Sequence, residues 1–503
     1  MAVINRDIIR DDALFSCLQH PERGVWNKEQ FCERIDQWKA YLVNECDFRK
    51  GDLLLNGIVI ADWNHFAVAL AVAELGGINL KLHYVYTPEL WHYSLAKYTK
   101  PKVMLLESWM EGEKGEIANF EEGRRHHERC GTFRVGSNDF DSFISDYDKP
   151  QSRPDPVVSP SDPIQLANAY GYKTDGLKVI THRHGEFYKE AKRNAEVLNM
   201  KDKVAVYMNN INHARSFQGF FLPALFAAKY HEFINTPDDP EWFRPDINEG
   251  FARVLGSNKQ KILCAQNVPV LEHVLTRPEK LGDNLDVYLM FNKVNARIKR
   301  ISKFMDNHRV NLLFGEEDTG AIIFKHGVYE NTPEDNCIGE PLDDYYDMRF
   351  EDDGSCLVKA PHLDQWRVLG DYFIENEGSV HHKPWRHPLH DRVLEILGYD
   401  RFDVFTIYGQ TFLNIWHWNG VGVEINEDQQ SKLDELGLTG IHQLHWEAYR
   451  HSDERDWWAL KMHYSMGYKY PVKTWEDYES ERVKTEKITS RYRYDPLDFV
   501  GKV

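Results

Sequence analysis

Four histidines stand within the ten residues 381–390, HHKPWRHPLH, and imidazole nitrogens gathered in this way could bind zinc. His387 and His390 are three residues apart, so they could share one face of a helix. A zinc site needs further ligands, and no carboxylate or cysteine is placed with them at ligand spacing. We therefore interpret this stretch as a linker and not as a metal site.

Thiol chemistry is not indicated either. The seven cysteines are scattered, odd in number and without a C-x-x-C pair, which excludes a disulfide framework or a zinc ribbon. The pattern is typical of reduced thiols in a cytoplasmic protein. The first residues, MAVINRDIIRDD, have no apolar run after their charges, so we expect no signal peptide. The most apolar helical stretch, residues 66–73, is too short to span a bilayer.

The composition bounds the class of protein. Apolar residues make up 42% and charged residues 28% of the chain, as in globular proteins. A length of 503 residues predicts two or more domains. Lys and Arg number 61 against 79 Asp and Glu, a net charge of −18, so there is no evident nucleic-acid patch.

The elements that would position the functional residues are strands that alternate with helices. Apolar residues at helical spacing predict a helix over residues 28–47, and a second helix over residues 62–75 ends at Gly76-Gly77. Short apolar runs predict strands at residues 53–60, 78–82 and 103–106. This order is typical of parallel βαβ units and predicts an α/β fold.

The later part of the chain changes character. Residues 148–163 hold five prolines and predict an irregular connection. A strand at residues 311–314 runs into an acidic turn, and residues 347–380 read as a small antiparallel sheet. Beyond them the pattern predicts helices at residues 391–397 and 428–436 and strands at 404–408 and 457–463.

Residues 50–95 (KGDLLLNGIVIADWNHFAVALAVAELGGINLKLHYVYTPELWHYSL) carry the clearest resemblance to a known family. A Gly-Asp strand, a helix that ends in Gly-Gly, a strand and then T-x-E-L resemble the adenylate-forming superfamily, which includes acyl-CoA synthetases, adenylation domains and luciferases. The resemblance runs over most of residues 25–386. It implies a large AMP-binding domain, residues 1–386 with a subdivision near 148–163, and a small α+β lid-like domain, residues 387–503, on a hinge.

The family's phosphate loop, T-S-G-T-T-G-x-P-K-G, is matched by AYGYKTDGLKVITHRHG, residues 169–185. Lys178 stands at the family lysine, Thr174 at a family threonine and His184 at a following histidine. The resemblance implies that Lys178 and Thr174 bind the nucleotide phosphates. The loop's other hydroxyl and glycine positions hold Tyr172, Lys173 and Asp175, and a carboxylate repels phosphate.

Three further positions match in the family's order. His213, in MNNINHARSFQGF, stands at a histidine that lines the acyl pocket in relatives. In LLFGEEDTG, Gly315 matches the nucleotide-binding Y-G glycine and Asp318 matches an acid that binds magnesium. Carboxylate oxygen is the ligand type that Mg²⁺ prefers. The alternative for Asp318 is a solvated acidic turn.

The last matches flank the hinge. Gly370-Asp371, followed by Gly378 and Trp385-Arg386, reproduces the family's spacing from T-G-D to the hinge G-R. The resemblance implies that Asp371 binds the ribose hydroxyls and that Arg386 contacts the ribose or phosphates, for which its charge and fork geometry suit it. In KTEKITSRYR, Lys487 stands at the small-domain catalytic lysine, with Lys484 as the rival.

The resemblance implies a cytoplasmic ligase that uses ATP and Mg²⁺. The expected substrates are a small-molecule carboxylate and an acceptor, either a thiol such as CoA or an amine, with Lys487, Lys178 and Arg386 as catalytic residues. The altered phosphate loop leaves an alternative open, a non-catalytic or altered-activity descendant that serves as a binding or scaffold protein. The identity of the acid, the acceptor and the oligomeric state stay open.

Overall fold

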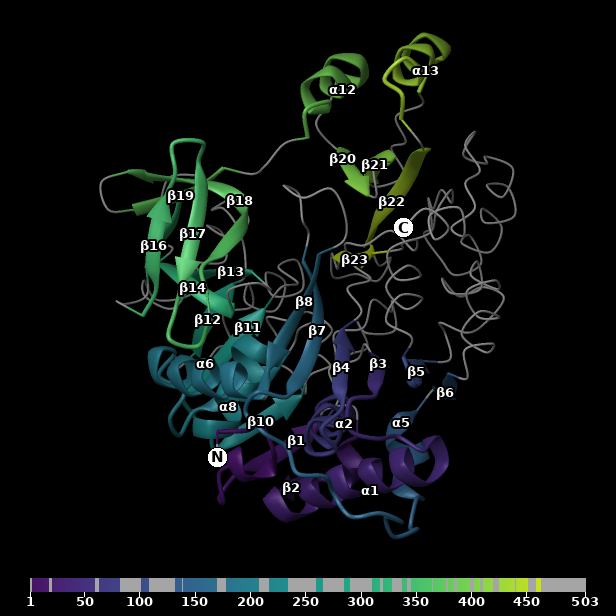
Figure 1. Ribbon diagram of the computed structural model, residues 1–503, viewed down its shortest axis with the longest axis vertical. Helices are drawn as coiled ribbons and strands as arrows, with labels where there is room; N and C mark the ends of the chain where they lie inside the picture. Colours follow the sequence, from purple (N-terminus) through teal and green to yellow (C-terminus); the bar gives the residue numbers. More distant parts are fainter. Residues whose placement is uncertain are drawn as a thin grey trace.

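The architecture is α/β and is organised around three sheets, so the fold class expected from the alternation of strands and helices is confirmed (Figure 1). Hydrogen bonding joins the described strands into groups of six, thirteen and four. The structure, a computed structural model, describes residues 2–17, 20–58, 63–81, 101–107, 132–137, 139–169, 178–207, 217–233, 259–265, 285–289, 310–316, 320–327, 337–341, 345–363, 365–376, 379–383, 387–398, 402–407, 410–418, 425–438, 440–450 and 458–462.

The six-stranded sheet has the order β6-β5-β3-β4-β7-β8. All neighbours pair in parallel except β7 and β8, which are antiparallel. Strand β3, helix α2 (Trp63–Glu74) and strand β4 form the βαβ unit that the sequence predicts. The strands are β3 (Leu53–Gly57), β4 (Ile78–Lys81), β5 (Val103–Glu107), β6 (Phe133–Ser137), β7 (Pro163–Ala169) and β8 (Lys178–Arg183).

The thirteen-stranded sheet has a parallel and an antiparallel half. The parallel half is β13 (Val310–Glu316), β12 (Leu285–Leu289), β11 (Lys261–Ala265), β9 (Val204–Tyr207), β10 (Tyr230–Phe233) and β1 (Leu14–Cys17), with β2 (Val25–Asn27) antiparallel at its edge. The antiparallel half is β14 (Gly320–Gly327), β15 (Cys337–Pro341), β19 (Ser379–Lys383), β18 (Arg367–Asn376), β17 (Ser355–Lys359) and β16 (Asp347–Phe350).

The small antiparallel sheet predicted for residues 347–380 is therefore present. It is joined edge to edge to the parallel sheet, because β15 pairs with both β14 and β19. One sequence interpretation is wrong here: the stretch 381–390 is not all linker. His381 and His382 lie in β19, paired with Ile374 and Phe373 of β18, because main-chain ladder bonds form whatever the side chain.

Helix α1 (Lys28–Cys46) illustrates how the sequence specifies a helix. Asn27 and Gln30 form a capping box, and Phe31, Ile35 and Trp38 are buried at helical spacing. Helix α2 (Trp63–Glu74) is buried along almost its whole length, and Gly76, with φ +64°, lies in the turn that follows it, as the sequence predicts. The other helices are η1 (Arg6–Ile8), η2 (Pro21–Arg23), α5 (Phe140–Ser145), α6 (His184–Val197), η5 (Phe217–Phe221), α8 (Leu222–Ala227), α12 (His390–Leu397) and α13 (Glu427–Asp434).

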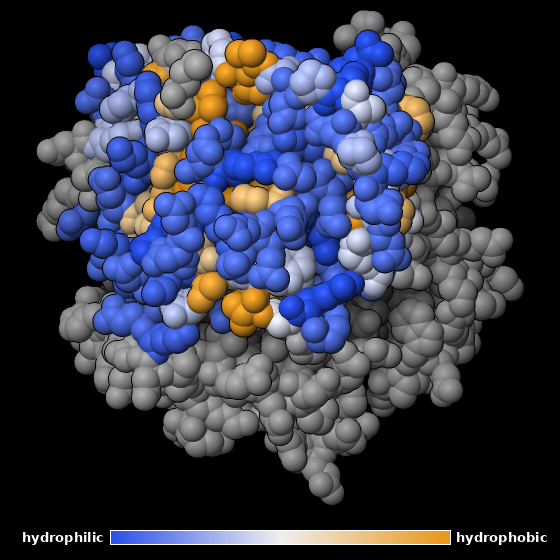
Figure 2. All heavy atoms as spheres, turned by 90° about the horizontal axis from the view of Figure 1, so that it is seen from below, coloured by the Kyte–Doolittle hydropathy of each residue, from blue (hydrophilic) through white to orange (hydrophobic). Residues whose placement is uncertain are grey.

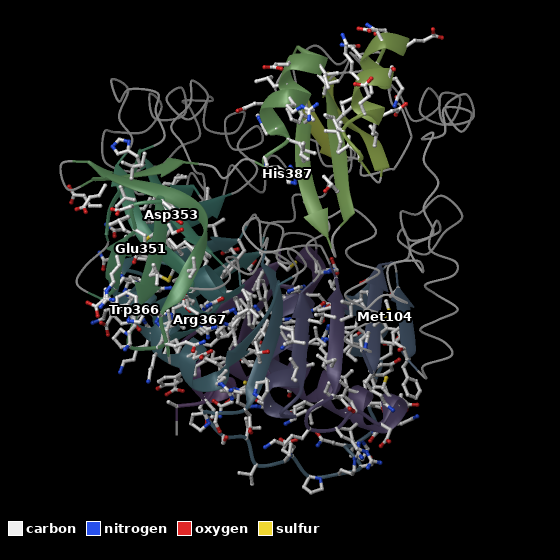
Figure 3. The ribbon with its side chains drawn as sticks, turned by 45° about the horizontal axis from the view of Figure 1, so that its top comes forward. Met104, Glu351, Asp353, Trp366, Arg367 and His387 are labelled. Atoms are coloured by element: carbon white, nitrogen blue, oxygen red, sulfur yellow. The ribbon has the colours of Figure 1, made fainter. Side chains whose placement is uncertain are left out.

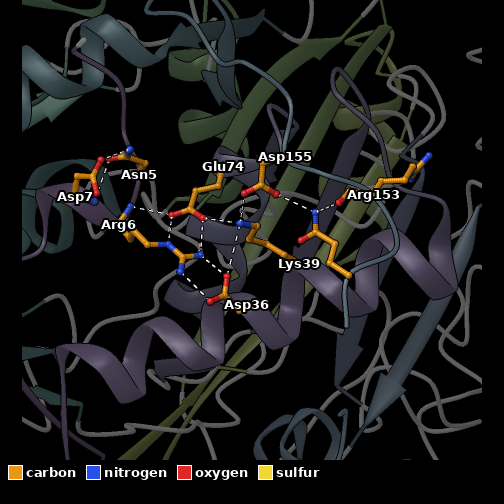
Figure 4. A network of polar contacts seen from close by, with 9 residues as sticks. Asn5, Arg6, Asp7, Asp36, Lys39, Glu74, Arg153 and Asp155 are labelled. Atoms are coloured by element: carbon orange, nitrogen blue, oxygen red, sulfur yellow. Dashed lines mark hydrogen bonds and ion pairs between the residues drawn. The ribbon is translucent and has the colours of Figure 1, made fainter. Parts of the chain in front are cut away.

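The proline-rich connection 148–163 is irregular up to β7, as predicted, but its side chains tie it to α1. Lys39 of α1 forms ion pairs with Asp155 of the connection and with Glu74 of α2, the latter at 3.0 Å (Figure 4). Arg6 bridges Glu74 and Asp36 in the same network. Charge-assisted contacts thus hold together the N-terminal segment, helices α1 and α2, and the connection.

A buried acid, Asp141 of α5, organises the packing of α5 on α1 and α2. Its Oδ1 accepts hydrogen bonds from Arg34 Nη1 at 2.6 Å, Trp63 Nε1 at 2.9 Å and Asn64 Nδ2 at 3.1 Å. Arg23 Nε lies 2.8 Å from Oδ2. Burial alone would raise the pKa of Asp141, but the Arg34 charge and the donors on Asn64 and Trp63 outweigh it and lower the pKa.

The C-terminal sheet has the order β20 (Phe402–Ile407), β21 (Gln410–Trp418), β22 (Gly440–Arg450) and β23 (Trp458–Met462). Its buried residues pack with those of α12 and α13 in one hydrophobic cluster, which includes Val393, Leu413 and Ile441. In the described ranges, no helix is long and apolar enough to cross a membrane. The face in Figure 2 is mostly hydrophilic, with hydrophobic residues in small separate groups.

Candidate functional site

Lys178 is the first residue of β8 and pairs with Ala169, the last residue of β7. Because β7 runs parallel to β4, Lys178 lies at the carboxyl edge of the six-stranded sheet. Ligands of open α/β sheets bind outside the carboxyl ends of parallel strands. The backbone position of Lys178 is therefore the one that a nucleotide site in this sheet would require.

Gly315 lies at the corresponding edge of the other parallel sheet. It is buried, it is the penultimate residue of β13, and β13 runs parallel to β12. The pairing with β14 shifts between Phe314 and Glu316, so Gly315 occupies an irregularity in the ladder. Such irregularities are common next to binding sites, where they end or redirect a strand.

Asp371 lies on β18, in a segment where the pairing with β17 is also irregular. Leu357 pairs with Val368 and Ser355 with Tyr372, so three residues of β18, 369–371, lie opposite Cys356 alone. Gly370 and Asp371 thus belong to a bulge. In Figure 3, Glu351 and Asp353 lie at one end of this antiparallel half and Trp366 and Arg367 lie nearer the parallel strands.

His184 has a structural environment. It begins α6, is fully buried, and its Nδ1 accepts a hydrogen bond at 3.2 Å from the main-chain N–H of Ile4. Burial lowers its pKa to about 4, so the ring is neutral at pH 7. The N-terminal segment covers this histidine, which therefore contributes to packing at the start of α6.

The other predicted site residues lie outside the part of the chain that the structure describes: Thr174, His213, Asp318, Arg386 and Lys487. Among the described residues, no group of three or more His, Cys, Asp or Glu side chains could hold a metal ion. The magnesium assignment to Asp318 thus stays a prediction.

A set of polar residues that the sequence reasoning did not single out is buried between α6 and η5. Glu190 and Asn194 of α6 are fully buried, and Gln218 of η5 is 2% exposed. Gln218 Nε2 donates to Glu190 Oε2, and Arg193 Nη1 donates to Asn194 Oδ1 at 2.9 Å. Their signal in the sequence is a glutamate and an asparagine, four residues apart, on the apolar face that Phe187 and Ala191 define.

Comparison with solved structures gives the fold a precedent. MatB from Rhodopseudomonas palustris, bound to ATP, matches 84% of this chain and 89% of that chain with a TM-score of 0.58 and 13% sequence identity. The anthranilate CoA ligase AuaEII, in complex with anthranoyl-AMP, matches 87% of this chain and 92% of that chain, with a TM-score of 0.60 and 11% sequence identity. The long-chain-fatty-acid-CoA ligase FadD1 from Archaeoglobus fulgidus matches 88% of this chain and 97% of that chain, with a TM-score of 0.58 and 12% sequence identity.

No protein-family model and no curated protein matches the sequence. The structural matches nevertheless extend over most of the chain, and they confirm the expected resemblance at the level of the fold. The chain has the fold of the adenylate-forming enzymes.

Proposed function

We propose that the protein is an ATP-dependent ligase that activates a carboxylate as its acyl-adenylate and passes the acyl group to a thiol or an amine. The observation that carries this proposal is the backbone position of the motif residues. Lys178 and Gly315 lie at the carboxyl edges of two parallel sheets, in a fold that other proteins use to bind ATP and an acyl-AMP.

The proposed first step is an attack by a carboxylate oxygen of the substrate on the α-phosphorus of ATP. The bond between the α-phosphorus and the bridging oxygen of the β-phosphate breaks, and pyrophosphate leaves. Lys178 and Arg386 would neutralise charge on the phosphates, and Thr174 would donate a hydrogen bond to them. Asp371 would accept hydrogen bonds from the ribose hydroxyls.

A magnesium ion would be held by Asp318, whose carboxylate oxygens fit this hard cation, and it would offset the charge of the phosphates. His213 would line the pocket for the acyl group. In the second step, the thiol of a carrier such as CoA, or an amine, attacks the acyl carbon and AMP leaves. Lys487, on the small domain, would bring the carboxylate and the α-phosphate together in the first step only.

A second candidate function is favoured by one specific observation. Tyr172, Lys173 and Asp175 stand where the phosphate loop of relatives has hydroxyl and glycine residues. Hydroxyls and exposed main-chain N–H groups are the donors that such a loop needs. A protein that kept the fold and lost this loop would act as a binding or scaffold protein.

Exchange of labelled pyrophosphate into ATP, driven by a panel of carboxylic acids, distinguishes the two. The ligase should exchange with at least one acid, and Asp371→Ala should abolish both this exchange and the thermal stabilisation by ATP. Asp347→Ala, at an exposed position on β16 in the same antiparallel half of the sheet, is the matched control and should retain both. No exchange with any acid, together with unchanged melting in millimolar ATP and magnesium, would refute the ligase.

The two half-reactions give a second test. Lys487→Ala should block adenylate formation and still permit transfer from a pre-made acyl-adenylate, whereas Lys484→Ala, the matched control, should support both. Equal loss of both steps in Lys487→Ala would exclude this lysine from the chemistry.

A further inference from the structure

Helix α6 places polar side chains where a helix of an α/β protein normally places apolar ones. Glu190 and Asn194 are completely buried on its inner face, and the neighbouring Arg193 is 9% exposed. A buried carboxylate costs desolvation free energy that an apolar residue of similar size would not. In some proteins, side chains of this kind are retained because they fix one arrangement of the elements that they join.

Arg193 joins α6 to the antiparallel half of the thirteen-stranded sheet. Its guanidinium lies 4.8 Å from the ring centre of Tyr345 and 5.2 Å from that of Tyr346. Tyr345 is fixed in turn, because its ring stacks on His362 and its hydroxyl lies 3.0 Å from His362 Nδ1. These residues directly precede β16 and follow β17, so they belong to the same antiparallel unit as β18 and Asp371.

Glu190 joins the same helix to η5. Its Oε2 accepts from Gln218 Nε2, and Asn194 Nδ2 donates to its Oε1 at 3.5 Å. Since Arg193 donates to Asn194, a continuous series of contacts runs from Tyr345 to Gln218. The five residues of η5 form a π-helix, a rare geometry that is frequent at functional sites.

The two ends of this series belong to different elements, and each element is connected along the chain or the sheet to a residue of the proposed site. At one end, the antiparallel unit carries Asp371, the proposed ribose ligand. At the other end, η5 begins directly after residues 208–216, which include His213, the proposed acyl-pocket residue. Helix α6 itself follows β8, which begins with Lys178.

We propose that Arg193 and Gln218 are positioning residues: through Asn194 and Glu190 they hold η5, which follows the proposed acyl-pocket residue in the sequence, and the antiparallel unit that carries Asp371 in one fixed arrangement. This inference rests on the proposed ligase function. A rigid chain of contacts between two sub-sites couples their ligands, so loss of one contact should weaken the binding of both substrates.

The test uses the full-length protein and pyrophosphate exchange. Arg193→Ala should raise the KM for ATP and for the carboxylate, each by about 5- to 30-fold, with a smaller effect on kcat. Lys192→Ala removes the neighbouring cation from the exposed side of the same helix and should change neither KM. A merely structural role of Arg193 would lower the amount of active protein and leave both KM values unchanged, which would overturn the proposal.

An exchange of partners tests the other end. Gln218→Glu sets two carboxylates against each other and should raise the KM for the carboxylate. Adding Glu190→Gln restores an amide and a carboxylate with their places reversed, and should bring that KM back to within about threefold of the original value. A double variant no better than Gln218→Glu would overturn the pairing.

Hydrogen exchange separates failure of this inference from failure of the ligase. Arg193→Ala should speed amide exchange in both β18 and η5 and leave β3 unchanged, whether or not the protein binds ATP. If the unmodified protein proves inactive, the ligase is refuted, and faster exchange in both segments would still support the coupling. Faster exchange in β18 alone would overturn it.

Discussion

Substitution of Asp141 offers a direct test of how α5 is held on α1 and α2. In Asp141→Ala, Arg34 loses its 2.6 Å partner while it remains 4% exposed. Breaking a buried ion pair from one side typically costs about 3–5 kcal/mol, because the remaining charge stays buried with neutral partners, here the side-chain oxygen of Asn64 at 2.7 Å from Arg34 Nη1. The N–H groups of Trp63 and Asn64 lose the same acceptor, which argues for the upper part of that range.

This cost translates into a large change in melting temperature. For a cooperative unit of about 150–250 residues, each kcal/mol lowers Tm by about 2–4 °C, so we expect a loss of about 6–20 °C at pH 7. Asp141→Asn keeps an oxygen acceptor for Trp63 and Asn64 and loses only the charge, so its Tm should lie between that of the unmodified protein and that of Asp141→Ala.

Differential scanning calorimetry at one scan rate measures these shifts, and the pH dependence tests their origin. The pKa of Asp141 is lower in the folded than in the unfolded state. Its contribution is therefore complete above the unfolded value of about 3.9 and is lost as pH falls through the lower folded pKa. The difference between the unmodified protein and Asp141→Asn should thus persist at pH 5 and shrink only below about pH 4.

The matched control is an exposed ion pair. Lys149 and Glu45 are 2.7 Å apart with 63% and 38% of their side chains exposed, so Lys149→Ala should hardly alter Tm. If Asp141→Ala melts as close to the unmodified protein as Lys149→Ala does, the electrostatic account of this cluster is refuted.

Three further predictions concern packing, protonation and domain structure. Gly77→Ala would place its Cβ 2.4 Å from Phe48 Cε1 and should destabilise the protein by about 1–3 kcal/mol in urea unfolding; a loss under about 0.5 kcal/mol would show that the ring moves aside freely. The pKa of His184 is about 4 when folded and about 6.5 when unfolded, so its neutral form stabilises the fold above pH 6.5 and this contribution decreases as pH falls from 6.5 to 4. His184→Asn keeps an acceptor for Ile4 and should reduce that slope by up to about 1.4 kcal/mol per pH unit, whereas an unchanged slope would show that His184 is already protonated in the fold. Deletion of residues 391–503 should leave a folded large domain that still binds ATP, because the buried cluster of that region has its own members; a truncated protein that unfolds with the deletion would contradict this.

The sequence predicted the regular elements well because their signals are local. The apolar spacing of Phe31, Ile35 and Trp38 and the stop at Gly76-Gly77 depend on neighbours in the chain, and α1 and α2 end within one residue of the expected positions. The same local patterns located the short strands β16, β17 and β18.

The pairing of strands that are distant in the chain was harder to predict from the sequence. Nothing near His381 shows that β18 lies beside it, so the stretch read as a linker although its main chain completes a ladder. The structure places Lys178, Gly315 and Asp371 on strands, and their roles stay predictions from motif spacing. Motif spacing did not indicate Glu190, because the role of a charged residue on an apolar helix face can be inferred only when its partner is known. The partner here is Gln218, 28 residues further along the chain.

The pairing of β1 with β10 has a consequence for synthesis on the ribosome. Leu14 pairs with Tyr230, so an early strand finds its parallel neighbour only after more than two hundred further residues have been added. At about 5–20 residues per second, the nascent chain waits roughly 10–40 s. During that time β1 can form its hairpin with β2, but its other edge, next to the aromatic pair Phe15 and Phe31, stays open. Translation speed and chaperone supply should therefore influence the yield of folded protein.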